Sequence, residues 1–319
     1  MRDKNIGVIT TVVGTGEKGH DGDGGPATAA RLDLPFTVAF DRSGNLLVAE
    51  AGANSVRRVD TAGRISTVYG PTGARPEDVA AVAAGFESGP KERFAVVERL
   101  SRKVRFFPGP TVEDARFRDP HDVIRFAKNS VLVADVAASQ VHEIDVESGA
   151  ILRTLGTGRK AREGDGGPVE KASFQGSRAL ARDPRDGTLY VIEREGHRIR
   201  RVDPKGVITT LAGLGKPGYE GDGGPASAAS FRGPKGACVD PKSGDLYVVD
   251  TENHAVRRID AKTGVITTVA GGRKGAAGDG GPATAAGLDR PHGIALSPDG
   301  ARLYIADSEN HRVRRVVLR

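Results

Sequence analysis

The sequence predicts an all-β protein built as a ring of six similar units, and three observations support this prediction. Gly-Asp-Gly-Gly-Pro occurs four times in the 319 residues, and its last three copies are 57 residues apart. A second block, of the type Leu-Tyr-Val-Val-Asp followed by Val-Arg-Arg-Ile, recurs six times. Residues 6–13 copy a segment of the fifth unit that the sixth unit lacks. Internal repeats of this length are typical of β-propellers, so we expect a six-bladed β-propeller of four-stranded blades.

Each unit is expected to contain four short strands. An apolar segment comes first, a turn rich in Asp, Pro and Gly leads to the second strand, and six residues later a Val-Arg-Arg-Val type strand follows. A last turn leads to Ile-Thr-Thr-Val, and this alternation of β-branched residues and turns indicates strands. The expected blades of this single domain are 35–70, 76–110, 120–156, 176–213, 234–271 and 291–319. Residues 1–13 should supply the missing fourth strand of the last blade, which removes two exposed sheet edges.

Composition excludes several classes of protein. With 38% hydrophobic and 28% charged residues the chain is globular, and no run approaches the length of a membrane span. A single cysteine, Cys238, excludes an internal disulfide framework and multi-cysteine zinc sites. The first residues lack the apolar stretch of a signal peptide, which favours the cytoplasm, or secretion if the natural chain begins upstream. A net charge of +6 permits nucleic-acid binding, but tryptophan is absent and few aromatic residues could stack on bases.

The sixth unit contains Pro291-His-Gly-Ile-Ala, Leu303-Tyr-Ile-Ala-Asp and Glu309-Asn-His-Arg-Val. This pattern resembles the NHL repeat, and the added glycine-rich segment is similar to that of bacterial and teneurin-like NHL propellers. The resemblance implies the fold, but it leaves the function open because one fold hosts many functions. NHL propellers include RNA-binding and protein-binding domains. Related six-bladed propellers include the peptidyl-α-hydroxyglycine α-amidating lyase, gluconolactonases and strictosidine synthases.

The strand order predicts which residues surround the central channel. The glycine-rich loops and the connections between second and third strands should share one end of the ring, which we call the upper face. Loops on a rigid scaffold commonly carry function, so this face is the expected ligand face. The residues that begin the inner strands should ring the channel there: Phe36, Glu77, His121, Ser177, Lys235 and His292. The next residues along are Thr37, Asp78, Asp122, Arg178, Gly236 and Gly293.

An acidic corner with one imidazole is expected where the second and third units meet. It consists of Glu77, Asp78, His121 and Asp122, in units that lack the long glycine-rich loop. In the amidating lyase, metal-binding histidines occupy the Pro-His slot that His121 and His292 match. The resemblance therefore implies Glu77, His121 and His292 as metal ligands, with zinc as the candidate metal and no other cofactor indicated. Without a metal, His121 beside Asp122 could act as a general base, or the histidines could simply fill the channel mouth.

The remaining recurrent residues are interpreted as structural. An acid closes the second strand of every unit and should bond turn N–H groups or a neighbouring arginine; these acids are Glu50, Glu98, Asp135, Glu193, Asp250 and Asp307. The loop aspartates Asp23, Asp165, Asp222 and Asp279 are expected to cap short helices, with calcium as the weaker alternative. The Arg-Arg pairs on third strands should point to opposite faces and pair with carboxylates. His197, His254 and His311 are expected in turns, and Cys238 in the core.

The predicted function is recognition of a protein, peptide or small ligand on the upper face. The site would include Phe36, Glu77, Asp78, Ser177, Arg178, Lys235 and His292. A metal-assisted lyase or hydrolase at the top of the channel is the alternative, and RNA binding ranks third. We expect a monomer that does not bind membranes.

Overall fold

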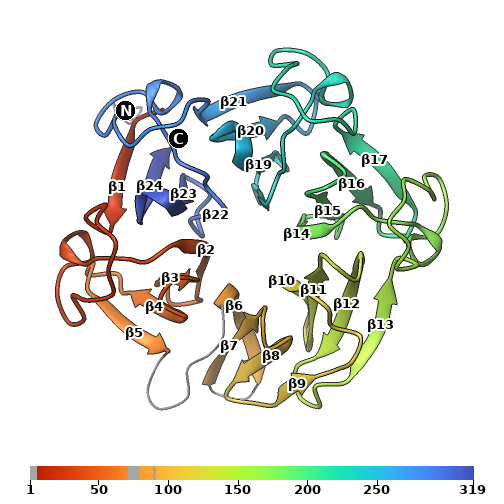
Figure 1. Ribbon diagram of the computed structural model, residues 1–319, viewed down its shortest axis with the longest axis horizontal. Coiled ribbons are helices and arrows are strands. Elements are labelled where there is room, and N and C mark those ends of the chain that lie inside the picture. Colours follow the sequence, from red (N-terminus) through yellow and green to blue (C-terminus); the bar gives the residue numbers. More distant parts are fainter. Residues whose placement is uncertain (1–5, 71–78, 89–90) are drawn as a thin grey trace.

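The described residues of the computed structural model, 6–70, 79–88 and 91–319, form six four-stranded antiparallel sheets around a central axis (Figure 1). In five of these blades the strands follow each other in sequence order from the axis outward. The sixth sheet has the order β22-β23-β24-β1, so its outermost strand comes from the beginning of the chain. The predicted six-bladed propeller is therefore confirmed.

The strand bounds of the first three blades are as follows. Blade 1 consists of β2 (Pro35–Phe40), β3 (Leu46–Glu50), β4 (Ser55–Val59) and β5 (Ile65–Tyr69). Blade 2 consists of β6 (Val79–Ser88), β7 (Lys91–Glu98), β8 (Lys103–Phe107) and β9 (Thr111–Glu113). Blade 3 consists of β10 (Pro120–Ala127), β11 (Ser130–Asp135), β12 (Gln140–Asp145) and β13 (Ile151–Leu155).

The other three blades repeat this plan. Blade 4 consists of β14 (Ser177–Arg182), β15 (Leu189–Glu193), β16 (Arg198–Val202) and β17 (Ile208–Ala212). Blade 5 consists of β18 (Gly236–Val239), β19 (Leu246–Asp250), β20 (Ala255–Ile259) and β21 (Ile266–Gly271). Blade 6 consists of β22 (Ile294–Leu296), β23 (Arg302–Asp307), β24 (Arg312–Val317) and β1 (Ile9–Val13). Short 3₁₀ turns lie at Ala27–Ala29, Val169–Lys171, Ala226–Ala228, Thr251–Asn253, Ala283–Ala285 and Ser308–Asn310. None of these described helices has the length needed to span a membrane.

The ring is closed by β1, which runs antiparallel to β24 (Figure 1). Ile9 pairs with Val316 and Thr10 with Arg315. Ile9 is fully buried, as the copied sequence of residues 6–13 predicted. Strand β1 therefore completes the last blade as its outermost strand.

The hydrophobic core of the described residues is divided into six clusters, each between two neighbouring blades. Between blades 4 and 5, for example, Ile192 and Ala179 pack with Val248 and Ile259. Because both faces of a blade are covered by its neighbours, the second strands β3, β15 and β19 are buried at every position.

Glycine allows the inner strands to approach each other closely. A Cβ atom on Gly236 would lie 2.4 Å from the carbonyl oxygen of His292. A Cβ atom on Gly293 would lie 2.5 Å from the carbonyl oxygen of Phe36. These two positions were predicted to face the channel, and the structure shows that they are the contact points of blades 5, 6 and 1.

Each glycine-rich loop covers the outer strand of the blade that follows it. Before blade 1, the Gly24 N–H donates to the Ile65 carbonyl at 2.8 Å, and the Ile65 N–H donates to the Gly25 carbonyl at 3.0 Å. The same pattern protects β17, β21 and β1 at Ile208, Ile266 and Ile9. Blades 2 and 3 have no such loop, so the described part of their outer edges lacks this cover.

Candidate functional site

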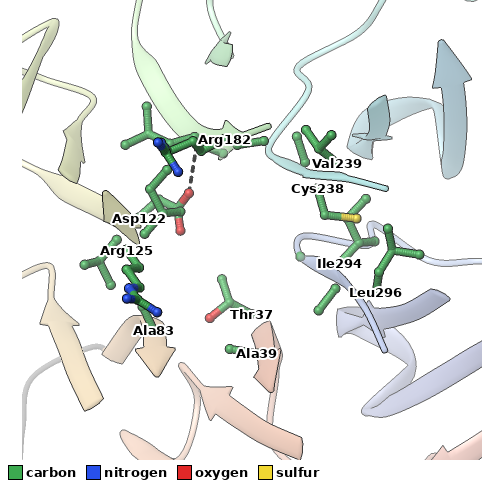
Figure 2. A pocket seen from close by; sticks show the side chains of 18 of the residues that line it. Thr37, Ala39, Ala83, Asp122, Arg125, Arg182, Cys238, Val239, Ile294 and Leu296 are labelled. Atoms are coloured by element: carbon green, nitrogen blue, oxygen red, sulfur yellow. Dashed lines mark hydrogen bonds between the residues drawn. The ribbon is translucent and has the colours of Figure 1, made fainter. Parts of the chain in front are cut away.

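The inner strands of all six blades surround a cavity of about 750 Å³ (Figure 2). Each inner strand is the edge strand of its sheet, so some of its backbone N–H and C=O groups face this space. Arg125 and Lys128 line the cavity and are exposed, and both lie where the inner strands end. The cavity therefore reaches solvent at the lower face, opposite the face on which the sequence predicted the ligand.

Most of the cavity wall is apolar. Figure 2 shows Ala39, Ala83 and Ile294 on different inner strands around the same space. Cys238 lies in the wall on β18, where burial raises the pKa of its thiol. This agrees with its predicted packing role.

Of the predicted ring residues, His121, Ser177, Lys235 and His292 are buried, and Phe36 is half-buried. The Phe36 ring stacks on His292, with 4.3 Å between ring centroids and 7° between the planes. The Ser177 hydroxyl donates to the carbonyls of Asp135 and Gln140, at 3.0 and 2.9 Å. Lys235 is 7% exposed, and its Nζ donates to Glu252 Oε1 at 2.8 Å. Glu77 and Asp78 lie outside the described residues. Phe36, His292 and Ser177 thus contact a neighbouring blade, and of the described ring residues only Phe36 is partly exposed.

The two Pro-His histidines adopt the same geometry. His121 Nδ1 lies 3.0 Å from the Asp119 carbonyl, and His292 Nδ1 lies 2.8 Å from the Arg290 carbonyl. Because a carbonyl only accepts, each Nδ1 carries the proton and each Nε2 is left as an acceptor. Burial, together with nearby cations, holds the pKa of both imidazoles well below the usual range. Both rings are therefore neutral near pH 7.

Asp122 and Thr37 connect inner strands of neighbouring blades. A carboxylate oxygen of Asp122 accepts the Leu180 N–H of β14 at 2.8 Å (Figure 2). The Thr37 hydroxyl accepts the Val82 N–H of β6 at 3.2 Å. Burial raises the pKa of Asp122 to about 6. Asp122 and His121 thus make separate contacts, and their predicted role as a catalytic pair stays a prediction.

Arg178 is the next residue of the ring and is 2% exposed. Its Nη1 donates to the His121 carbonyl at 3.4 Å, which joins blade 4 to blade 3. Its positive charge lowers the pKa of His121, His292 and Lys235, so the guanidinium lies among these three side chains. Burial lowers the pKa of Arg178 itself to about 10. Among the described residues at this end, Arg178 has no carboxylate within ion-pair distance, whereas Lys235 pairs with Glu252.

The described part of the ring contains two of the three predicted zinc ligands, His121 and His292, so the zinc site stays a prediction. No three His, Cys, Asp or Glu side chains come together among the described residues, and the predicted ligand Glu77 is outside them. The Nε2 atom of His292 lies 3.4 Å from Lys235 Nζ, and that of His121 lies 3.5 Å from Arg99 Nη1. A divalent cation bound to either histidine would be repelled by these cations.

The recurrent acids are structural, as predicted. Glu50 accepts the Asp33 N–H, and Asp250 accepts the Arg232 N–H, each at 2.8 Å. These N–H groups lie in the segment that leads into the inner strand of the same blade. In blades 1, 3, 4, 5 and 6 the acids therefore fix where the inner strand begins.

The prediction that the loop aspartates cap short helices is wrong. Proline occupies the cap position of each 3₁₀ turn in the glycine-rich loops, and no side-chain cap hydrogen bond forms. Each aspartate instead pairs with a fully buried arginine of the covered blade: Asp23 with Arg57, Asp165 with Arg200, Asp222 with Arg257, and Asp279 with Arg314. The local sequence resembles a helix start and so suggested a cap. It could not show the arginine, which lies 34 or 35 residues away.

The repeat histidines join each blade to the next. His197, His254 and His311 have φ between 50° and 54°, a left-handed turn conformation. The Nδ1 of His254 accepts the Arg290 N–H at 3.1 Å, and that of His197 accepts the Gly233 N–H at 3.0 Å. They are turn residues, as predicted, with an additional bond between blades.

Two cations at the lower end of the cavity were not predicted. Arg125 projects toward the cavity from β10, and Arg182 lines it from β14 (Figure 2). Arg182 Nε is buried without a hydrogen-bond partner. Both arginines stand near the end of an inner strand. The site expected from the sequence lies on the upper face and includes only the beginnings of the inner strands.

Sequence comparison supports the repeat assignment. The NHL repeat model matches residues 231–259 and 288–316. NHL repeat-containing protein 2 of Gallus gallus is 26% identical over 283 residues, covering 83% of this chain and 36% of that protein. Teneurin-1 of Mus musculus is 26% identical over 273 residues, covering 78% of this chain and 9% of that protein. The chain thus spans about a third or less of these curated relatives.

Solved structures share the fold. An auxiliary nutrient binding protein from Bacteroides ovatus has a TM-score of 0.71 at 20% identity, covering 97% of this chain and 76% of that one. A catalytically inactive virginiamycin B lyase from Staphylococcus aureus, with quinupristin, has a TM-score of 0.55 at 16% identity, covering 89% and 80%. The chain is therefore a six-bladed β-propeller in which residues 231–259 and 288–316 match the NHL repeat.

Proposed function

We propose that this propeller binds a small, partly apolar molecule in its central cavity. The observation that supports the proposal most directly is the cavity itself, about 750 Å³ and walled by all six inner strands. Ligand pockets in proteins commonly measure about 300–1,000 Å³ and combine apolar walls with a few polar groups. This cavity has that composition, with Thr37, Asp122 and Lys235 as polar groups at its upper end.

The proposal refines the predicted recognition role and changes its place. Most described side chains of the upper ring are buried, whereas the exposed residues Arg125 and Lys128 border the cavity at the lower face. The nutrient binding described for the Bacteroides ovatus protein is compatible with a ligand site in such a propeller. Recognition of a protein or peptide on the upper face stays a prediction.

Binding of an uncharged fluorescent probe tests the proposal. N-phenyl-1-naphthylamine brightens in apolar surroundings, and the chain has no tryptophan to interfere. We expect saturable brightening with the unaltered protein and a loss of at least ten-fold in affinity in Ala39→Phe, whose new ring would occupy the cavity. Ala62→Phe, at an exposed turn, is the matched control and should bind normally. Absence of brightening, or equal loss in both variants, would overturn the proposal.

A further inference from the structure

The fully buried arginines of the described residues differ in one respect. Four of them pair with a loop aspartate at N–O distances of 2.5–2.7 Å, namely Arg57, Arg200, Arg257 and Arg314. Arg178 is as large and almost as buried, yet it has no carboxylate partner among the described residues. Its one hydrogen bond, to the His121 carbonyl, is long at 3.4 Å. A buried guanidinium with so few partners is costly unless another group satisfies it.

The cavity next to Arg178 carries an excess of positive charge. Its lining includes four cationic side chains, Arg125, Lys128, Arg182 and Lys235, and within the described part of the chain a single carboxylate, that of Asp122. Lys235 lines the upper end and lies close to Arg178, whose charge lowers its pKa. The lining is thus matched to a ligand that brings negative charge.

Asp122 raises the pKa of Arg178 through its charge, but it does not form an ion pair with the cations of the cavity. Its carboxylate is committed to the Leu180 N–H, and it forms no ion pair within 4.0 Å of Arg178 or Lys235 in the structure. Burial raises the pKa of Asp122 to about 6, which means that the ionised form of this carboxyl is disfavoured relative to an exposed aspartate. An anion near Arg178 would therefore meet one buried cation that has no carboxylate partner among the described residues, Arg178, and a second, Lys235, whose Nζ is shared with Glu252.

We propose that the molecule bound in the cavity carries an anionic head group, a carboxylate or a phosphate, that Arg178 and Lys235 hold at the upper end. This inference rests on the proposed function. Attraction between charges is strong in this buried place because little water screens it. Arg125 and Lys128 at the lower mouth are exposed and serve to attract the anion from solvent. The apolar remainder of the ligand then lies along the cavity wall.

Displacement of N-phenyl-1-naphthylamine by three ligands of six carbon atoms each tests the inference. Hexanoate and hexyl phosphate carry the two kinds of anion, and hexanamide is the uncharged counterpart. We expect at least one anion to displace the probe at a concentration ten-fold or more below that of hexanamide. A preference for hexanoate or for hexyl phosphate identifies the head group. If the probe binds and the amide competes as well as both anions, the inference fails while the proposed function stands. If the probe does not bind, the proposed function fails first.

Variants with opposite expected effects separate recognition from damage to the fold. Arg178→Met and Lys235→Met should lower the affinity for the preferred anion roughly ten-fold and leave the affinity for hexanamide unchanged. Asp122→Asn keeps an oxygen acceptor for the Leu180 N–H and removes the negative charge that repels an anion. It should therefore raise the affinity for the anion several-fold. Arg31→Ser, at an exposed loop pair, is the control. Equal changes for the anion and the amide in these variants would contradict the proposal, and thermal melting shows which variants are folded.

Discussion

The guanidinium of Arg257 is fully buried, and its Nη2 lies 2.7 Å from Asp222 Oδ1. The same carboxylate accepts the Thr268 N–H of β21 at 2.8 Å through its other oxygen. Arg257 also donates to the Ser230 carbonyl at 2.7 Å. One residue thus ties a glycine-rich loop to the middle of a blade. Removal of its charged partner should be costly because the guanidinium would stay buried.

We therefore expect Asp222→Ala to destabilise the protein by roughly 1–3 kcal/mol, because the fully buried guanidinium of Arg257 loses a hydrogen-bond partner, although the Asp222 side chain is itself 44% exposed. Asp21→Ala is the control, since Asp21 pairs with Arg31 where both side chains are about half exposed. That variant should change stability little because exposed pairs contribute little. Urea unfolding of the two variants measures the difference. Equal decreases in the free energy of unfolding for the two variants would show that the pair with Arg257 contributes no more to stability than the exposed pair.

Blade 3 has a histidine where blades 1, 4, 5 and 6 have the buried arginine. His142 is fully buried, its Nδ1 lies 3.0 Å from the Thr154 hydroxyl, and its Nε2 has no partner. Blade 3 also lacks the glycine-rich loop that would bring an aspartate. The buried arginine and the loop aspartate thus occur together or are absent together. An uncharged side chain suits a position with no counter-ion.

Burial lowers the pKa of His142 in the folded protein. The unfolded chain therefore binds a proton at this residue at a higher pH than the folded chain, and acidification through about pH 6.5 favours unfolding. We expect the melting temperature of the unaltered protein to fall more between pH 7.5 and 5.5 than that of His142→Gln. The buried acids Asp122, Asp250 and Asp307, whose pKa values are raised to about 6, oppose this trend equally in both proteins. Parallel pH profiles would contradict the prediction.

At the level of elements, the blades differ in how their outer strands are protected. The Ile208 N–H of β17 donates to the Gly167 carbonyl of the covering loop at 3.0 Å, and the Thr210 N–H donates to Asp165 at 3.1 Å. No such loop precedes blade 3, and Leu152 of β13 is 57% exposed. An uncovered edge opens more readily and offers its amides to water.

Hydrogen exchange followed by mass spectrometry measures this difference directly. We expect peptides from β13 to exchange at least ten-fold faster than peptides from β17, although both strands are outermost in their sheets. The second strands β11 and β15, both buried throughout, serve as the internal reference and should exchange slowly alike. Similar rates for β13 and β17 would mean that the loops do not protect the blades they cover.

At the level of the whole molecule, stability depends on ring closure. Ile9 of β1 is fully buried in the cluster between blades 5 and 6. We expect Ile9→Ala to cost about 2–5 kcal/mol, the usual range for such a truncation. Calorimetry should show one transition at lower temperature, because each blade is held by both neighbours. Thr10→Ala, at a partly exposed site of the same strand, is the control. A separate early transition would mean that blade 6 unfolds alone.

The sequence predicted the ring because repeated units reveal themselves by spacing, whatever their contacts. It placed β1 in the last blade, and Phe36, His121, Lys235 and His292 at the upper end of the inner strands. It could not show that these side chains pack against each other, because that depends on how closely neighbouring blades approach. The lower cavity mouth with Arg125 was missed for the same reason. The aspartate of each loop was misplaced because its arginine partner is distant in sequence.

The pairing of β1 with β24 also sets the order in which the protein can be completed during synthesis. Chains grow at about 5–20 residues per second, so β1 waits on the order of 15–60 s before β24 is made. During that time Ile9–Val13, a run of β-branched residues, has no strand beside it. Such segments are the ones that associate between chains. Expression at slower translation should therefore increase the aggregated fraction, and a chaperone that covers the nascent β1 should reduce it.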